Sequence, residues 1–344
     1  MSHYNAAIVG CGRIGSEFDE DPMMRKNYGI ASHAGAYMNH PEIKLVAAAD
    51  ISAEKRQKFS LRWGVNRVYA DYSEMLRNEN IDILSICTPN FTHYDIFEKA
   101  IERGVRAIFC EKPISDSLEN ADKMVKIIQE NDVTFLVNHR RRWDHLYLDL
   151  RKLIGEGGLG DIHQVSCYYN GGIANTGCHI FDVLRMLFGE ARFVTAWRKD
   201  SHEKDDPNMD GYLVFENDVT VSMQSLDIQT YMIFEFDIYG AKRRFRIKQN
   251  GFEVGFWEAI ASYRYDGLNE LVLQDSPIVL QDPAMFKNAI QNIVDSLKGN
   301  AKSNCSGEDG VKALEMISAF HLSALTDKTV SLPLKERTYY VKSK

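Results

Sequence analysis

The chain has 344 residues, of which 44% are hydrophobic and 26% charged, with a formal net charge of -7 at pH 7. This length and composition fit two packed domains of ordinary soluble type and exclude fibrous and disordered chains. Lys and Arg are scattered, which argues against a nucleic-acid-binding protein, although Arg140, Arg141 and Arg142 form one basic cluster. No apolar run approaches the roughly 20 residues that cross a bilayer, and the N-terminus lacks the layout of a signal peptide, so we expect a cytoplasmic protein.

The N-terminal stretch 5–15 leads from a short apolar run into three glycines, which predicts a strand, a tight turn and a helix start. Gly10 would allow the turn, Gly12 would let a pyrophosphate approach the backbone, and Gly15 would let the helix pack closely on its strand. The N–H groups of the first helical turn would attract phosphate. Three glycines near an apolar run also occur in ordinary loops, so this pattern needs support from its surroundings.

That support comes from a second predicted strand over residues 44–49, which ends at Asp50. A carboxylate at this position can accept hydrogen bonds from both hydroxyls of an adenosine ribose. It would also repel the 2′-phosphate of NADP, so NAD is favoured over NADP. The alternative role of Asp50 is a cap for the helix that follows.

An insertion is expected between these two motifs, because 35 residues separate Gly15 from Asp50 where roughly 20 are usual. The surplus corresponds to residues 16–30, which are polar and interrupt the first helix. This segment is either a lid over the cofactor crevice or a plain surface excursion. The helix is expected to resume with Ser32 as its cap and to end before Pro41.

Helices and strands alternate beyond Asp50, which predicts a parallel sheet. The expected elements are a helix capped by Ser52 and running through Phe59 and Leu61, a strand at 68–69, a helix at 72–78, a strand at 81–87, a helix at 94–102, a strand at 107–110, a helix at 117–130 and a strand at 134–137. Ligands bind at the carboxyl ends of such strands, where Thr88, Asn90 and His93 follow one strand. Glu111 and Lys112 follow the next.

Lys112 is the most informative of these residues. A cation at the mouth of the crevice, held by the proline after it, can favour a developing alkoxide beside the nicotinamide. The alternative is a surface ion pair with Glu111. The cofactor-binding residues predicted from the motifs are Gly10, Gly12, Arg13, Ile14, Asp50, Thr88, Asn90, His93, Glu111 and Lys112.

The second half of the chain has a different order of elements. After a helix at 143–154, a strand at 162–169 and one further helix, strands follow one another at 193–197, 212–215, 219–225, 233–239 and 244–247. Consecutive strands joined by turns at 216–218 and 240–241 predict a broad, mostly antiparallel sheet. Helices at 286–297 and 310–325, the latter capped by Ser306, complete this half. A second subunit is a plausible cover for the open sheet face, so we expect a homodimer or homotetramer.

The candidate catalytic segment is 175–182. In a helix from about Thr176, Asn175 would lie over His179 with Asp182 beside them, while the apolar residues face the core. Imidazole is the side chain whose pKa suits removal of a hydroxyl proton near neutral pH, so His179 is the candidate base. A buried structural histidine is the alternative. The six cysteines show no CxxC spacing, and we expect them to be reduced and structural, with no metal site.

Together these motifs resemble the Gfo/Idh/MocA family (glucose-fructose oxidoreductase, inositol dehydrogenase and rhizopine catabolism). The matching segments are GCGRIG at 10–15, Asp50, TPNFTH at 88–93, EKP at 111–113, NHRRRWD at 138–144, NTGCHIFDVLRMLFGE at 175–190 and the late helix at 306–324 before VSLPL at 330–334. The resemblance implies an α/β Rossmann NAD-binding domain over 1–138. It implies a substrate-binding and oligomerisation α+β domain with a large open sheet over 139–344.

The resemblance also implies the chemistry. Family members transfer hydride between a ring carbon of a sugar, inositol or nucleotide sugar and NAD(P), and here Lys112 would be the electrostatic partner and His179 the base. Some relatives keep their NAD bound and use transient oxidation for elimination or glycoside cleavage. A non-catalytic dinucleotide-binding sensor is a third possibility.

This chain departs from the commonest family pattern at Asn175, where an aspartate is usual. An amide can orient an imidazole but cannot supply the negative charge that raises its pKa, so we expect His179 to be a weaker base than in those relatives. Asn175 could also be a helix N-cap. The segment 168–176 is short, and the Trp-Arg pair of many relatives is missing from it.

The predicted substrate-binding residues are Lys112, Arg141, Arg142, Tyr169, Asn175 and His179. An arginine at 141 or 142 can bind a substrate carboxylate or phosphate, or it can tie the domains together through Asp144 or another carboxylate. Tyr169, Asn170 and Asn175 would donate or accept neutral hydrogen bonds. We expect a small carbohydrate or polyol as substrate, with no nucleic-acid or membrane partner.

Overall fold

The computed structural model describes residues 3–199 and 205–343 of the chain. It contains two units: the described residues of the first are 3–144, 282–314 and Ser343, and those of the second are 145–199, 205–281 and 315–342. The chain first passes from one unit to the other between Asp144 and His145, whereas the sequence predicts a boundary between residues 138 and 139. The segment 282–314 differs from that prediction, because it packs with the first unit although it follows the second unit's strands in the sequence.

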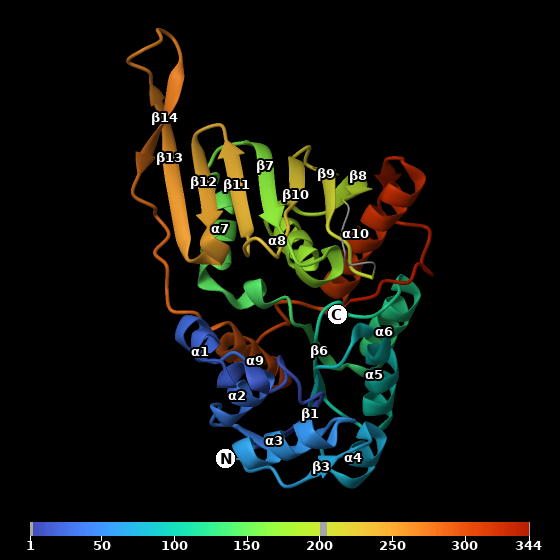
Figure 1. Cartoon of the computed structure of the whole chain (residues 1–344). Coiled ribbons are helices and arrows are strands. Elements are labelled where there is room, and N and C mark those ends of the chain that lie inside the picture. Colours follow the sequence, from blue (N-terminus) through green and yellow to red (C-terminus); the bar gives the residue numbers. More distant parts are fainter. Residues whose placement is uncertain (1–2, 200–204, 344) are drawn as a thin grey trace. The chain divides into compact units, whose positions relative to one another are not determined.

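The first unit is built on a six-stranded parallel sheet with the strand order β3-β2-β1-β4-β5-β6 (Figure 1). The strands are β1 (Tyr4–Val9), β2 (Ile43–Ala49), β3 (Val68–Tyr69), β4 (Ile83–Ile86), β5 (Ala107–Cys110) and β6 (Thr134–Val137). This order reverses between β1 and β4, which is where dinucleotides bind in doubly wound sheets. The predicted parallel sheet is confirmed.

The helices of the first unit are α1 (Pro22–Tyr28), α2 (His33–Met38), α3 (Ala53–Trp63), α4 (Tyr72–Asn78), α5 (His93–Glu102), α6 (Leu118–Asn131) and α9 (Met285–Leu297). A short polar side chain caps the start of each of these helices except α5 and α9. The side chains of Ser32, Ser52 and Ser117 each accept a hydrogen bond from the backbone N–H three residues further on. The predicted caps at Ser32 and Ser52 are confirmed.

The insertion at 16–30 is fastened to its own unit. It forms the 3-10 helix η1 (Glu17–Glu20) and α1, and the buried carboxylate of Asp19 accepts hydrogen bonds from the Ala31 N–H and the Ser32 hydroxyl. The Arg62 guanidinium donates to the Asp19 carbonyl at 2.6 Å. These contacts hold the first half of the insertion against α2 and α3, as expected of a structured surface excursion.

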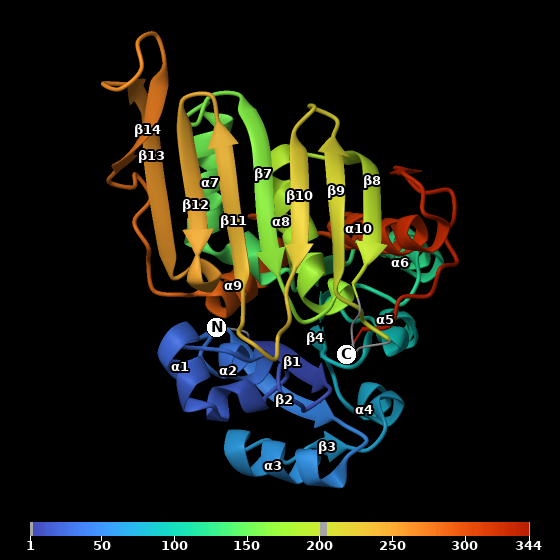
Figure 2. The same cartoon turned by 45° about the horizontal axis from the view of Figure 1, so that its top comes forward.

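The second unit is built on a nine-stranded sheet with the order β14-β13-β12-β11-β7-β10-β9-β8-β15 (Figure 2). The strands are β7 (Ile162–Tyr169), β8 (Ala191–Arg198), β9 (Met209–Phe215), β10 (Thr220–Ser225), β11 (Phe234–Gly240), β12 (Arg243–Lys248), β13 (Glu253–Ala261), β14 (Asn269–Gln274) and β15 (Val330–Ser331). Among the described strands, β7 and β10 pair in parallel and all other neighbours are antiparallel. The predicted mostly antiparallel sheet is confirmed.

Helices lie against one face of this sheet (Figures 1 and 2). They are α7 (His145–Gly155), α8 (Cys178–Phe188) and the later part of α10 (Gly307–Thr326). Phe236 on β11 is buried on this face with its ring centroid 6.3 Å from that of Tyr147 on α7. Because side chains alternate along a strand, Glu235, Asp237 and Tyr239 lie on the opposite face.

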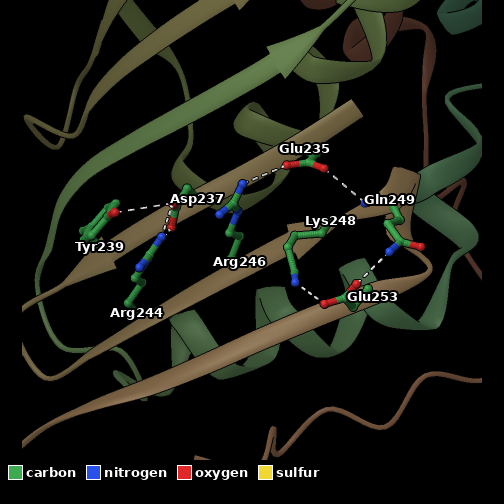
Figure 3. A network of polar contacts seen from close by, with 8 residues as sticks. All are labelled: Glu235, Asp237, Tyr239, Arg244, Arg246, Lys248, Gln249 and Glu253. Atoms are coloured by element: carbon green, nitrogen blue, oxygen red, sulfur yellow. Dashed lines mark hydrogen bonds and ion pairs between the residues drawn. The ribbon is translucent and has the colours of Figure 1, made fainter. Parts of the chain in front are cut away.

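The opposite face carries a row of paired charges on β11, β12 and β13 (Figure 3). Arg244 binds the Asp237 carboxylate with two contacts of 2.7 and 2.5 Å, and Arg246 lies 3.1 Å from Glu235. Lys248 and Glu253 form a third pair. Trp197 on β8 and Tyr212 on β9 are 47% and 51% exposed, so aromatic and charged side chains share this face.

Strands β13 and β14 were not predicted. The exposed pattern of β14 lacks the alternation that marks a strand packed on a core, because the hairpin lies at the edge of the sheet. The two strands extend beyond the rest of the sheet (Figure 1). None of the six cysteines is in a disulfide bond. Among the described helices, none combines the length and apolarity needed to span a bilayer.

Candidate active site and cofactor site

The glycine turn after β1 combines two glycines that the protein's own packing requires with one that it does not. A Cβ on Gly10 would lie 2.6 Å from the Cys87 carbonyl oxygen at a φ of +99°, and a Cβ on Gly15 would lie 2.1 Å from the Gly10 carbonyl oxygen. A Cβ on Gly12 would meet only the Lys55 ammonium, at 3.4 Å. The space beside Gly12 therefore remains open for a ligand, which fits a dinucleotide pyrophosphate.

The next two residues of the turn contact their own unit. The Arg13 guanidinium lies over the Phe18 ring, 4.7 Å from its centroid. The Ile14 carbonyl accepts a hydrogen bond from the His33 N–H, so the turn is joined to the start of α2. Both residues stay predictions as cofactor contacts.

Asp50 at the end of β2 lies directly beside this turn. One carboxylate oxygen accepts from the Cys11 N–H at 2.8 Å, and the other accepts from the Ser52 N–H at 2.8 Å. Burial, followed by the charge of Asp50, raises the pKa of the Cys11 thiol to about 12. Asp50 therefore fixes the turn after β1, and Ser52 caps α3, while the contact of Asp50 with a ribose stays a prediction.

The loop after β4 is held by its own polar side chains. His93 is fully buried, with Nε2 2.8 Å from the Thr88 carbonyl and Nδ1 3.2 Å from the Ile114 carbonyl. Burial lowers the pKa of this imidazole. The Asn90 amide donates to the Ser115 carbonyl. The structure therefore places His93 and Asn90 inside the unit, where they shape the loop, and it leaves Thr88 partly accessible.

Glu111 lies at the end of β5 and points into the unit. Its carboxylate accepts from the Asn138 amide at 2.6 Å and lies 3.0 Å from Nε2 of His33. The other ring nitrogen of His33 lies 2.8 Å from the Ser85 hydroxyl, which in turn lies 2.7 Å from the Tyr37 hydroxyl. Burial raises the pKa of Glu111, but the hydrogen bond and charge of His33 outweigh it and hold that pKa below its usual value.

This network changes the interpretation of the Glu111-Lys112 pair. Glu111 is 6% exposed and its carboxylate is bound by His33 and Asn138, and the charge of Lys112 also helps to lower its pKa, so an interaction of the two residues would not be a plain surface ion pair. Lys112 itself is partly accessible between the buried Glu111 and Pro113. The Lys112 backbone N–H donates to the Glu111 carboxylate at 3.4 Å. The network therefore fixes the backbone from which the lysine projects.

Arg142 has a structural partner. Arg141 and Arg142 lie in the 3-10 helix η3 (Arg140–Trp143) and are both buried. The Arg142 guanidinium lies 3.0 Å from the Asp309 carboxylate and donates to the Asn304 carbonyl at 3.3 Å. Arg142 thus binds a carboxylate of the protein, but Asp309 belongs to the same unit, so this contact is not the tie between domains that was the alternative role. Arg141 stays a predicted substrate residue.

The candidate catalytic segment in the second unit begins with a π-helical turn, η4 (Ile173–Gly177), before α8. Between residues 172 and 184, the residues that are not buried are Asn175, Thr176 and His179. His179 thus lies off the buried stripe, as predicted from the sequence, and Asp182 is buried. The Asn175 amide donates to the Gly171 carbonyl at 3.2 Å, and the N-cap positions of η4 and α8 are glycines, Gly172 and Gly177.

Two other predicted substrate residues face the interior. Tyr169 is fully buried, and its hydroxyl donates to the Met209 carbonyl at 2.8 Å and accepts from the Met209 N–H at 3.0 Å. Asn170 is also buried, where its amide contacts the Tyr231 carbonyl and the Ile233 N–H. Tyr169 joins the end of β7 to the start of β9, and Asn170 binds the segment just before β11, so the prediction that they bind substrate is not supported.

Comparison with known families matches both halves of the chain. The family model described as "Oxidoreductase family, NAD-binding Rossmann fold" matches residues 4–139, and the model described as "Oxidoreductase family, C-terminal alpha/beta domain" matches residues 168–332. The chain belongs to the Gfo/Idh/MocA family. The resemblance stated from the sequence motifs is confirmed, and the first unit is an NAD-binding Rossmann domain of an oxidoreductase.

Named relatives of this Gfo/Idh/MocA protein include dehydrogenases. A D-apiose dehydrogenase of Paraburkholderia graminis is 22% identical over 96% of this chain and 90% of the relative. An inositol 2-dehydrogenase of Rhizobium meliloti is 25% identical over 94% of this chain and 98% of the relative. The solved WlbA dehydrogenase of Chromobacterium violaceum, in complex with NADH and UDP-GlcNAcA, is similar with a TM-score of 0.79 at 21% identity, covering 98% of both chains. That likeness shows the shared fold.

Sequence reasoning missed several residues that shape the site. His33 and Asp19 lie in or near the insertion and bind Glu111 and Ser32, respectively. Asp206 accepts hydrogen bonds from the segment that carries Asn175. A single sequence offers no signal that brings these partners together, since each pair is separated by 13 to 78 residues.

Proposed function

We propose that this protein is an NAD-dependent dehydrogenase that transfers hydride between a ring carbon of a sugar, inositol or nucleotide sugar and nicotinamide. The observation that carries the proposal is the accessible edge of Asn175, Thr176 and His179 on an otherwise buried segment of an oxidoreductase fold. The names of the relatives support the substrate class, since they act on apiose and inositol, and WlbA was solved with a nucleotide sugar.

In the proposed reaction, His179 accepts the proton of the substrate hydroxyl while hydride leaves the carbon that bears it. Bound NAD supplies the hydride acceptor. The Lys112 ammonium stabilises the negative charge that develops on the substrate oxygen. The buried partners of Glu111 keep the backbone at Lys112 in one position, so the ammonium projects from a fixed point.

We propose that the cofactor is NAD in preference to NADP. The Asp50 carboxylate lies beside the glycine turn and would repel a 2′-phosphate. Arg56 is the cation that lies near Asp50. Its guanidinium donates to the Asp50 and Ile51 carbonyls, so it is bound to the protein's own backbone. The cofactor-binding roles of Gly12, Thr88 and Lys112 belong to the same proposal.

We also propose that the protein forms a homodimer or homotetramer through the open face of the nine-stranded sheet. Exposed Trp197 and Tyr212 lie there with the paired charges of Figure 3, and aromatic residues and arginines are enriched at protein interfaces. Light scattering tests this, and Tyr212→Arg should shift the protein toward monomer. The cytoplasmic location expected from the sequence stays a prediction.

The proposed function is tested by a screen of cyclic polyols, sugars and nucleotide sugars for NADH absorbance. We expect steady NADH formation with one class of substrate, and a loss of about 10²-fold or more in Lys112→Ala and His179→Ala. Lys123→Ala and His163→Ala are matched controls, because both residues are exposed and lie outside the site. Each variant must bind NAD as the wild type does.

Two outcomes of this screen would replace the proposal. Substrate turnover without net NADH would indicate that NAD stays bound and is oxidised and reduced within each cycle. Tight NAD binding without turnover of any compound would indicate a sensor. Full activity in His179→Ala would remove the imidazole from the mechanism.

A further inference from the structure

Three residues that no motif includes bind the start of the candidate catalytic segment. Four successive backbone N–H groups, of residues 172–175, each donate to Asp206, Pro207 or Asn208. The Gly172 N–H donates to the Asn208 side chain at 3.0 Å, the Ile173 N–H to the Pro207 carbonyl at 3.0 Å, and the Ala174 and Asn175 N–H groups to the two Asp206 carboxylate oxygens at 2.7 and 2.9 Å.

The chain at 171–172 is shaped to admit the Asp206 carboxylate. Gly171 and Gly172 have φ values of +86° and +94°, which other residues rarely adopt. A Cβ on Gly172 would lie 2.3 Å from a carboxylate oxygen of Asp206. The carboxylate therefore occupies the space of a missing side chain, and any residue larger than glycine would displace it.

Asp206 is 3% exposed, and a buried carboxylate is costly unless it is hydrogen-bonded. Its two N–H donors come from the first turn of the helical segment, where the helix macrodipole also favours a negative charge. The N-cap positions of η4 and α8 are Gly172 and Gly177, which have no side chain, so the Asp206 carboxylate caps the start of this segment from outside it. Asn175 lies on the accessible edge of the segment.

We propose that Asp206 is a positioning residue for the candidate active site: by binding the N–H groups of Ala174 and Asn175, it fixes the direction in which Asn175 and His179 face the substrate. This inference rests on the proposed function of His179. It also accounts for a catalytic segment whose first turn is π-helical, because the carboxylate holds the backbone of that turn from outside the helix.

The variants Asp206→Asn and Asp206→Ala test the proposal in the full-length protein. Asparagine keeps one acceptor oxygen and alanine keeps none, so kcat should fall in the order wild type, Asn, Ala. A misplacement of about 1 Å can cost about 10²-fold, so we expect kcat to fall by roughly 10- to 100-fold in Asp206→Ala. The KM for NAD should not change, because Asp206 lies in the second unit. Asp205→Asn is the matched control, since Asp205 is exposed and pairs with Lys342.

A double-mutant cycle separates positioning from simple destabilisation. Because Asp206 is proposed to orient both Asn175 and His179, the part of its effect that acts through Asn175 should disappear in an Asn175→Ala background, so Asp206→Asn should lower kcat by a clearly smaller factor there than in the wild type. A destabilised fold would instead reduce activity by the same factor in both backgrounds. That result, or a kcat of Asp206→Ala within twofold of the wild type, would overturn the proposal.

Two further variants, Asn208→Ala and His179→Ala, cover the cases in which the Asp206 variants alone give no answer. If both Asp206 variants fail to fold, Asn208→Ala removes the single contact to the Gly172 N–H, and it should lower kcat while the KM for NAD stays constant. An unchanged kcat in a folded Asn208→Ala variant would then count against the proposal. The His179→Ala variant is measured in parallel. If His179→Ala keeps full activity, the proposed function fails. If His179→Ala loses activity but the Asp206 variants keep theirs, only the role of Asp206 is overturned.

Discussion

Replacing Gly12 with alanine separates cofactor binding from folding more cleanly than any other change in the glycine turn. The added methyl group would meet only the flexible end of Lys55 at 3.4 Å, so the fold should accept it. An alanine at a compatible position stabilises a protein by about 0.4–1 kcal/mol through the unfolded chain. In a domain of this size 1 kcal/mol shifts Tm by about 2–4 °C, so Tm should stay constant or rise slightly.

The same methyl group fills the space through which a pyrophosphate would approach the backbone. Hydrogen bonds to charged groups contribute about 1.5–3 kcal/mol, so we expect NAD to bind about 10- to 150-fold more weakly. Calorimetric titration with NAD and a thermal melt of the same sample measure the two effects.

Gly15→Ala is the comparison variant, because its Cβ would lie 2.1 Å from the Gly10 carbonyl oxygen. We expect that variant to lose stability, with Tm falling by many degrees. Wild-type NAD affinity in Gly12→Ala would refute the assignment of this space to the pyrophosphate. An unfolded Gly12→Ala variant would show that the turn needs the glycine for its own packing.

Three other substitutions test separate parts of the account. Asp50→Asn should weaken NAD binding about tenfold and reduce the preference for NAD over NADP, so an unchanged ratio of KM values would contradict the role of the carboxylate. Glu111→Gln should lower the free energy of unfolding at neutral pH. The pKa of Glu111 is lowered in the folded state, so the ionised carboxylate stabilises the fold and this contribution is lost as the carboxylate protonates. The difference in unfolding free energy between the variant and the wild type should therefore shrink below about pH 4.3. Urea unfolding at several pH values measures this, and a difference independent of pH would contradict it. Arg142→Ala should lower the free energy of unfolding by about 1.5–3 kcal/mol, because the contact with Asp309 is lost. A raised KM for substrate without a loss of stability would show instead that Arg142 binds substrate.

The sequence predicted well those features that depend on nearby residues. Ser32 and Ser52 were recognised as caps because a cap and its helix lie within three residues of each other. The turn between β9 and β10 followed from the Glu216-Asn217-Asp218 triplet, in which Asp218 has a φ of +63°. The position of His179 off the buried stripe followed from the spacing of apolar residues around it.

Features that depend on distant partners could not be predicted in this way. Tyr169 and His93 are polar residues near strand ends, where a ligand contact and a structural contact look alike in a sequence. The structure assigns both side chains to backbone groups of the protein, with Met209 lying 40 residues from Tyr169. Asp206 belongs to an unremarkable Asp-Pro-Asn loop until the fold brings it to Asn175. The edge strand β14 has no buried face, so its sequence lacks the alternation of apolar and polar residues that predicts a strand.

The central claim is that Lys112 and His179 act on the same substrate oxygen beside the nicotinamide. A crystal structure of the complex with NAD and a bound polyol or sugar tests it most directly. We predict that the Lys112 Nζ and one ring nitrogen of His179 both lie within roughly 3 Å of one substrate hydroxyl, with the carbon that bears it facing the nicotinamide ring. A complex in which either side chain points away from the substrate and the nicotinamide would contradict the account.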